Sequence, residues 1–143
     1  MSKTQKKLET ATMDFLMTTG LLVRRLRAES ASHELSWSQL VVMKRLDSEP
    51  ATTADLARAE SVKPQSMGAT LNALEQWGLV ERRPHPSDGR QVVFALTDEG
   101  HRVREKASAD KRAWLMAAVA ELSPEDQDTL FAATAVIRRL VER

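Results

Sequence analysis

Residues 64–77 carry an outer row of amide and small side chains whose chemistry suits contact with the edges of DNA bases. If this segment is a helix, the row lies opposite Met67, Leu71 and Leu74. Gln and Asn amides can bond adenine in bidentate fashion, a Ser hydroxyl can bond several bases, and an Ala methyl can touch the methyl of thymine. The row and its flanks comprise Gln65, Ser66, Ala69, Thr70, Asn72, Ala73 and Gln76. By composition alone, a merely solvated face fits equally well.

Basic side chains gather around residues 84–90, a stretch rich in turn-forming residues. An arginine at such a tip can reach phosphates or enter a narrow minor groove, where the potential is most negative. Asp88 lies two residues before Arg90, which predicts a charge-assisted pair that holds the guanidinium in place. The candidate contacts of this region are Arg82, Arg83, His85, Asp88 and Arg90. Without further context, an ordinary polar loop with a weak surface ion pair is the simpler interpretation.

A short helix, a tight connection and a longer helix are predicted to position the amide-rich row. They span about 53–60, 61–63 and 64–77. Pro64 suits the first helical position, where its missing N–H has no intrahelical partner, and Gly78 is a natural C-terminal stop.

After Gly78 the spacing of the apolar residues changes from a helical period to alternation. Residues 79–83 are predicted to form a short strand, and residues 91–97 alternate with Val92, Phe94 and Leu96 on one face. These two strands and the loop between them make a β-hairpin. Helix, short helix, turn, helix and hairpin follow in the order of a winged helix-turn-helix.

Amphipathic helices are predicted before, beside and after this module. One of them is expected to start at Ser36, whose spacing to Gln39 fits a capping box, with Trp37, Leu40 and Val41 beginning its buried face. It should end before Pro50. The others span 6–29, about 98–121 and 124–142.

The flanking helices offer more apolar surface than the module alone should cover, which favours an intertwined helical dimer. The predicted fold is therefore mainly α with a small β-hairpin. It has an N-terminal dimerisation helix in 1–35, a winged helix-turn-helix in 36–97 and C-terminal dimerisation helices in 98–143.

Composition excludes several classes of protein. The chain has 143 residues, 42% of them hydrophobic and 29% charged, with a net charge of +1 and no cysteine. Disulfides, cysteine zinc sites and thiol redox sensing are therefore excluded, and a cytoplasmic protein without a membrane span is expected. No phosphate-binding glycine loop and no hydrolase or metalloprotease motif occurs, so we expect neither catalysis nor a cofactor.

Three stretches between residues 74 and 100 resemble the signature of the MarR (multiple antibiotic resistance regulator) family, and the resemblance extends in pattern over nearly the whole chain. The stretches are Leu74-Glu75-Gln76-Trp77-Gly78-Leu79-Val80-Glu81-Arg82, Pro86-x-Asp88-x-Arg90 and Leu96-Thr97-Asp98-Glu99-Gly100. The resemblance implies a dimer joined by the first and last two helices. It also implies a recognition helix at 64–77 in the major groove, contacting bases or phosphates through Gln65 and Ser66. A wing at 84–90 would enter the minor groove, with Arg90 oriented by Asp88.

One feature departs from the family pattern. Members often carry basic residues at the positions of Ala69 and Ala73, whereas residues 64–77 contain no Lys or Arg. We therefore expect more of the electrostatic binding to come from the wing, Lys63 and Arg58.

Scattered histidines and tryptophans give weaker signals. His33, His85 and His101 lie too far apart in sequence to form a recognisable metal motif, so no metal site is predicted. Trp37 and the nearby His33 would lie near the ligand cavity that the resemblance implies, where the dimer helices meet the winged domain.

The sequence thus predicts a homodimeric regulator of transcription that binds double-stranded DNA. It would act as a repressor, released when a small aromatic or phenolic effector favours the other of two dimer shapes. The alternative from another class is a winged-helix protein-interaction module without sequence-specific DNA binding. The uncharged recognition helix is the feature that supports this alternative.

Overall fold

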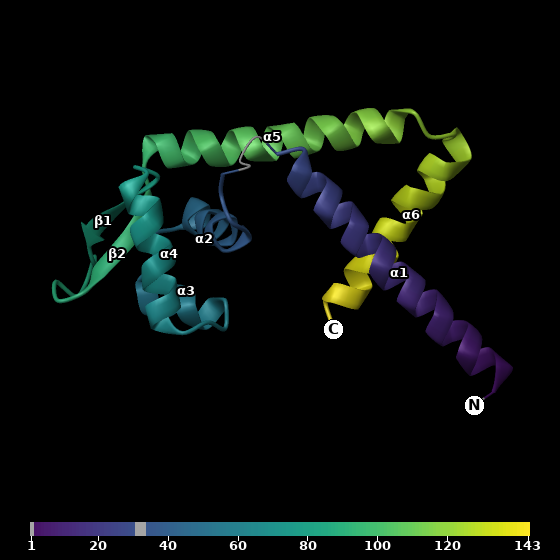
Figure 1. Ribbon diagram of the computed structural model, residues 1–143, viewed down its shortest axis with the longest axis horizontal. Coiled ribbons are helices and arrows are strands. Elements are labelled where there is room, and N and C mark those ends of the chain that lie inside the picture. The colour runs from purple at the N-terminus through teal and green to yellow at the C-terminus, as the bar shows by residue number, and fades with distance from the viewer. Residues whose placement is uncertain (1, 31–33) are drawn as a thin grey trace. The chain divides into compact units, whose positions relative to one another are not determined.

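The computed structural model describes residues 2–30 and 34–143 and confirms a mainly helical fold with a small antiparallel hairpin (Figure 1). The elements in chain order are α1 (Lys3–Ala28), α2 (Trp37–Ser48), α3 (Thr53–Ala59), α4 (Pro64–Gln76), β1 (Val80–Pro84), β2 (Val92–Leu96), α5 (Asp98–Ala120) and α6 (Pro124–Val141). Every predicted helix and strand is present, with boundaries within a few residues of those expected.

The chain divides into two compact units. One comprises residues 30–109 and contains α2, α3, α4, the hairpin and the start of α5. The other comprises residues 1–29 and 110–143, with α1, the end of α5 and α6. We name them the winged unit and the terminal unit.

A single apolar core holds the winged unit together. Met67, Leu71 and Leu74 recur at helical spacing along α4 and are almost completely buried, as predicted. The core residues contributed by the other elements are Val42, Met43 and Leu46 of α2, Leu56 and Ala57 of α3, and Val80, Phe94 and Leu96 of the hairpin. Because burial of each such side chain is worth about 2 kcal/mol, this core fixes α4 against the hairpin.

The start of α2 confirms the predicted capping box. The backbone N–H of Gln39 donates to Ser36 Oγ at 3.2 Å, and the N–H of Ser36 donates to Gln39 Oε1 at 2.8 Å. The predicted burial of Trp37 is wrong, because this side chain is 49% exposed. At 100° per residue Trp37 lies roughly opposite the buried stripe of α2, which begins only at Val42.

Schellman motifs end both helices of the helix-turn-helix, α3 and α4. After α4, the N–H of Leu79 donates to Leu74 O and that of Gly78 donates to Glu75 O, with Gly78 at φ +71°. After α3, Val62 and Ser61 make the equivalent bonds, and Ser61 adopts φ +54° without being glycine. The left-handed turn at Ser61 lets α3 pack against α4, and the one at Gly78 leads from α4 into β1.

The hairpin departs from the predicted alternation. Its register pairs Val80 with Leu96, Arg82 with Phe94, and Pro84 with Val92. Val92 is exposed, whereas residues 93–96 are all buried, so the prediction of one buried face is wrong. Strand β2 lies between β1 and the backbone of Ala51 and packs against α2, which leaves few of its side chains open to solvent.

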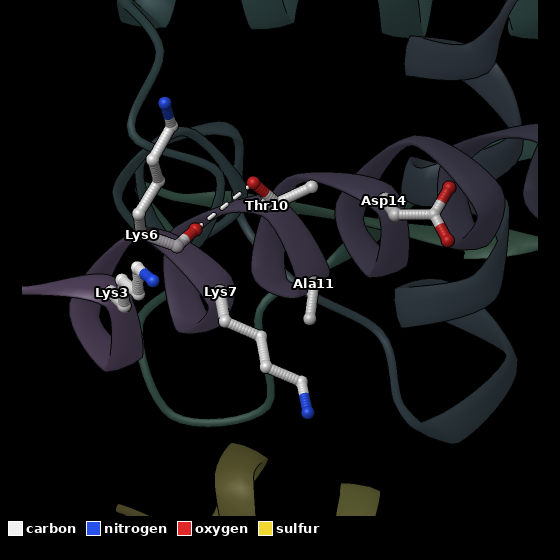
Figure 2. Close-up of a pocket in the computed structure, with 6 residues that line it drawn as sticks. All are labelled: Lys3, Lys6, Lys7, Thr10, Ala11 and Asp14. Carbon is white, nitrogen blue, oxygen red and sulfur yellow. Dashed lines mark hydrogen bonds between the residues drawn. The ribbon is translucent and has the colours of Figure 1, made fainter.

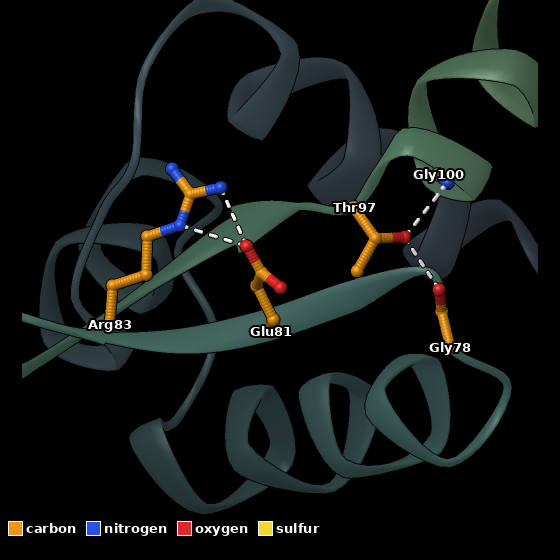
Figure 3. A network of polar contacts seen from close by, with 5 residues as sticks. All are labelled: Gly78, Glu81, Arg83, Thr97 and Gly100. Carbon is orange, nitrogen blue, oxygen red and sulfur yellow. Dashed lines mark hydrogen bonds and ion pairs between the residues drawn. The ribbon is translucent and has the colours of Figure 1, made fainter.

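Thr97 fastens the end of β2 to the start of α5 (Figure 3). Its hydroxyl donates to Gly78 O at 2.5 Å and accepts from the N–H of Gly100 at 3.1 Å. Its own N–H donates to Leu79 O at 3.1 Å. A Cβ on Gly100 would lie 2.1 Å from that same oxygen, so the close approach of α5 requires glycine.

The terminal unit has no buried residue in either α1 or α6 over their described lengths. The Arg25 guanidinium lies over the Trp114 ring at 5.2 Å, and Gln127 donates to Val119 O at 2.9 Å. The large apolar side chains that remain exposed on α1 and α6 are Leu8, Met13, Phe15, Leu16, Met17, Leu21, Leu22, Val23, Leu130, Phe131, Val136, Ile137, Leu140 and Val141. None of the described helices is sufficiently long and apolar to span a membrane.

Candidate nucleic-acid interface

The predicted row on α4 lies on the solvent side of the helix. Gln65, Ser66, Ala69 and Asn72 are exposed, as is Gln76 at the end of the helix. Thr70 differs from them, since it is half-buried and its hydroxyl donates to Ser66 O at 3.2 Å. The exposed part of the row therefore offers amide and hydroxyl groups that can bond base edges without first leaving an intramolecular partner, Asn72 excepted.

Asn72 belongs to a network with Arg82 and Glu75. Arg82 Nε donates to both carboxylate oxygens of Glu75, at 2.9 and 3.3 Å, and Arg82 Nη2 donates to Asn72 Oδ1 at 3.4 Å. The same guanidinium lies over the Phe94 ring at 5.4 Å. Sequence reasoning placed Arg82 among the DNA contacts and did not detect these partners, because they lie seven and ten residues away along the chain.

Two other predicted cationic contacts also have carboxylate partners. Arg83 Nη2 donates to Glu81 Oε1 at 2.6 Å on the hairpin face shown in Figure 3. Arg58 pairs with Asp55 one turn earlier in α3. Both pairs are largely exposed, so they contribute little to stability and can open toward a phosphate.

The predicted ion pair between Asp88 and the Arg90 side chain is absent from the described residues. Asp88 Oδ1 instead accepts from the backbone N–H of Arg90 at 3.1 Å. The carboxylate thus shapes the loop backbone and leaves the guanidinium without an ion-pair partner in the described chain. Lys63, at the N-cap of α4, likewise has no such partner there. Of the predicted cationic contacts, these two have no ion-pair partner among the described residues, so they can meet a phosphate without breaking an internal pair.

His85 organises the backbone of the wing. Its Nδ1 accepts from the N–H groups of Ser87, at 3.1 Å, and Asp88, at 3.0 Å. The N–H of His85 donates to Gln91 O at 3.2 Å, closing the loop across its base. His85 therefore acts on the position of Arg90 through the loop, a role that composition alone does not indicate.

Replacement of His85 by Ala is expected to weaken DNA binding about threefold to tenfold. The change removes the acceptor of two hydrogen bonds, each worth about 1 kcal/mol, so the loop that carries Arg90 becomes less ordered. Fluorescence anisotropy at fixed salt measures the effect. In His85→Asn the side-chain oxygen can accept in place of Nδ1, and most of the affinity should return. Equal losses in both variants would contradict this role.

Two cavities beside α2 include Trp37 in their walls. One, of about 610 Å³, lies between α2 and α3. The other, of about 260 Å³, lies between α2 and the start of α4 and is lined also by Val62, Met67 and Thr70. His33, the second predicted ligand residue, lies outside the described residues.

A depression on α1 gathers positive charge but has only one wall. Lys3, Lys6 and Lys7 line it together with Asp14, and all come from this single helix (Figure 2). Because no second element encloses it, it is an open helix surface. Among the described residues, no group of three or more His, Asp or Glu side chains is arranged to hold a metal ion.

An exposed amide-bearing helix after a Schellman turn, together with a neighbouring wing, defines a winged helix-turn-helix DNA-binding protein. The model of the MarR family matches residues 35–92. An HTH-type transcriptional regulator of Mycobacterium tuberculosis is 34% identical over 130 residues, which cover 90% of this chain and 91% of the relative. The chain therefore belongs to the MarR family of transcription regulators.

Solved structures agree with this fold. A putative transcriptional regulator of Pseudomonas aeruginosa has a TM-score of 0.81 at 29% identity, covering 99% of each chain. A mutant of Staphylococcus aureus MepR bound to an oligodeoxyribonucleotide has a TM-score of 0.71 at 18% identity, covering 92% of this chain and 97% of that one.

Proposed function

We propose that this protein is a cytoplasmic homodimeric repressor that binds double-stranded DNA and is released by a small effector. Residues 36–97 would read DNA, and the helices of 1–35 and 98–143 would join the protomers. The observation that carries the proposal is the exposed row on α4 beside a wing whose Arg90 side chain has no ion-pair partner among the described residues. The DNA complex of a MepR mutant with the same fold supports it.

Dimerisation is supported by the apolar surface of the terminal unit. Large exposed side chains recur along α1 and α6, for example Leu22, Phe131 and Leu140. Water-exposed stripes of this extent are rare on monomeric proteins and mark interaction surfaces. A two-fold dimer would place two α4 helices about one DNA turn apart, in successive major grooves.

The small-effector proposal rests on the cavity that Trp37 lines between α2 and α4. An aromatic ring could stack on this exposed indole beside Val41 and Val62, in the cavity that also touches α4. A ligand there would favour one spacing of the two α4 helices, and DNA affinity would change by its differential affinity for the two dimer shapes. No catalytic step is proposed.

The first test is an anisotropy titration against the DNA just upstream of the protein's own gene, at several salt concentrations and with competitor DNA. Arg90→Ala should lower affinity about tenfold and flatten the dependence of log K on log salt by about 0.9 if one phosphate contact is lost. Lys44→Ala, which removes a charge of the same sign from α2, is the matched control and should change neither.

The competing function is a winged-helix module that binds a protein instead of DNA. The absence of Lys and Arg from α4 and the internal pairing of Arg82 favour it. Weak wild-type binding that is equal for all duplexes, and unchanged in Arg90→Ala, would support this function and contradict the repressor. Repression itself is tested by a reporter fused to the upstream promoter, which should rise when the gene is deleted.

A further inference from the structure

The hydrogen bonds of Arg82 connect the wing strand to the second half of the recognition helix. Arg82 faces Phe94 directly across the hairpin ladder, and its guanidinium lies over that ring. Glu75 and Asn72, one turn apart on α4, accept from two different nitrogens of the same guanidinium. Three contacts from two elements thus hold one planar group, which suits the rigid fork of arginine.

These contacts leave Arg82 poorly suited to neutralise a phosphate. Its charge is already opposed by Glu75 at 2.9 Å, and this carboxylate would itself repel a phosphate. Arg90 and Lys63 have no such partner among the described residues. Arg82 therefore differs in kind from the cations that face DNA freely.

The same contacts also orient the Asn72 amide. Because Asn72 Oδ1 accepts from Arg82 Nη2, the oxygen turns toward the hairpin, and the amide N–H groups have no hydrogen-bond partner among the described residues. A bidentate bond to adenine needs both the oxygen and the nitrogen of the amide at the base edge. With the oxygen engaged, Asn72 presents N–H donors, and guanine offers two acceptors, N7 and O6, on its major-groove edge.

We propose that Arg82 is a positioning residue that holds Asn72 as a hydrogen-bond donor, so that Asn72 selects guanine rather than adenine at one operator position. This inference rests on the proposed function. It adds that a base preference of the recognition helix is set by a residue of the wing strand that touches no DNA.

The experiment selects duplexes from a randomised library with the wild type, five single variants and one double variant, and then measures affinity against salt. Arg82→Lys keeps the charge but lacks the fork, Arg82→Ala removes both, and Glu75→Gln removes the carboxylate that holds the guanidinium. Asn72→Ala removes the reader itself. Arg102→Ala, at an arginine of α5 that is likewise paired with a carboxylate, Glu99, is the matched control.

The expected result is loss of guanine preference at the same single position in Arg82→Lys, Glu75→Gln and Asn72→Ala, by about tenfold. The slope of log K against log salt should stay unchanged, because no phosphate contact is lost. The double variant Arg82→Lys/Asn72→Ala should lose no more than either single variant, since the two residues act as one unit. Glu75→Gln is the most discriminating of the variants, because removal of its negative charge would by electrostatics alone strengthen DNA binding. Arg102→Ala should keep the preference.

Uniform weakening over all sequences in Arg82→Ala, with a slope flatter by about 0.9, would assign Arg82 to a phosphate and overturn the inference. Additive losses of base preference in the double variant would also overturn the inference. So would a wild-type preference for adenine at the position where Asn72→Ala loses its preference. Thermal unfolding of each variant separates these outcomes from simple misfolding. If the wild type selects no sequence at all, the proposed function fails and this inference fails with it. If the wild type selects a specific sequence and Arg82→Lys, Glu75→Gln and Asn72→Ala all retain that selection, the inference fails and the proposed function stands.

Discussion

The double replacement Leu130→Asp/Ile137→Asp in α6 is expected to give a monomer that binds DNA about 100-fold to 10,000-fold more weakly than the wild type. The two side chains are seven residues apart, on one face of the helix, and both are about 40% exposed in the single chain. If the proposed dimer buries them, each carboxylate would have to be desolvated without a partner, which costs several kcal/mol. A monomer binds one half-site, so it loses the gain that comes from linking two binding modules.

Sedimentation equilibrium measures the dimer, and anisotropy measures the loss of DNA binding. The control is Ala135→Asp/Arg139→Asp, which adds two carboxylates on the polar side of the same helix, beside Asp128 and Glu142. It should remain a dimer of nearly wild-type affinity. A Leu130→Asp/Ile137→Asp variant that stays dimeric would remove α6 from the interface, and with it the main argument for the role of the terminal helices.

The elements of the winged unit could be predicted because their signals are local. The burial of Met67, Leu71 and Leu74 follows from helical period, and the ends of α4 follow from Pro64 and Gly78. Each of these signals needs only a few neighbouring residues. The exposed row of α4 was therefore predictable together with its buried face.

The roles of individual polar side chains could not be predicted, because these depend on contacts distant in sequence. The pairing of Arg82 with Asn72 and Glu75 needs both the hairpin register and the position of α4 beside β1. The exposure of Trp37 depends on where the buried stripe of α2 begins. The role of His85 as an acceptor depends on the path of the loop backbone. Composition correctly singled out a polar and basic surface, but it did not distinguish side chains that are free from those that are already paired.

The second large effect concerns the stretch Leu96-Thr97-Asp98-Glu99-Gly100. Resemblance to a family signature gives no physical reason for these residues, but the structure explains Thr97 and Gly100. Thr97 bonds to Gly78 O and to the N–H of Gly100, and Gly100 leaves room for Leu79 O. That oxygen also accepts from the N–H of Thr97. The end of α4, the start of β1 and the start of α5 therefore meet at one point.

Gly100→Ala is expected to destabilise the protein by about 1–3 kcal/mol, although alanine is the better helix former. The new Cβ would lie 2.1 Å from the backbone oxygen of Leu79 and 3.2 Å from Leu96 Cδ2. Backbone cannot rotate away as a flexible side chain does, so α5 must shift and strain the Thr97 bonds. Overpacking of this kind costs about 1–3 kcal/mol and a weakened hydrogen bond about 1 kcal/mol. The gain in helix propensity returns only about 1 kcal/mol.

Urea unfolding of the variant measures the loss, and Gly68→Ala is the matched control. Gly68 lies inside α4 of the same winged unit, and a Cβ there meets no atom within 4 Å, so only the propensity gain of about 1 kcal/mol should remain. The two identical substitutions should therefore change the free energy of unfolding in opposite directions. If Gly100→Ala were neutral or stabilising, the close approach of α5 to Leu79 would not exist in solution. Another explanation would then be needed for how the hairpin is held against α4, together with Arg82 and the wing.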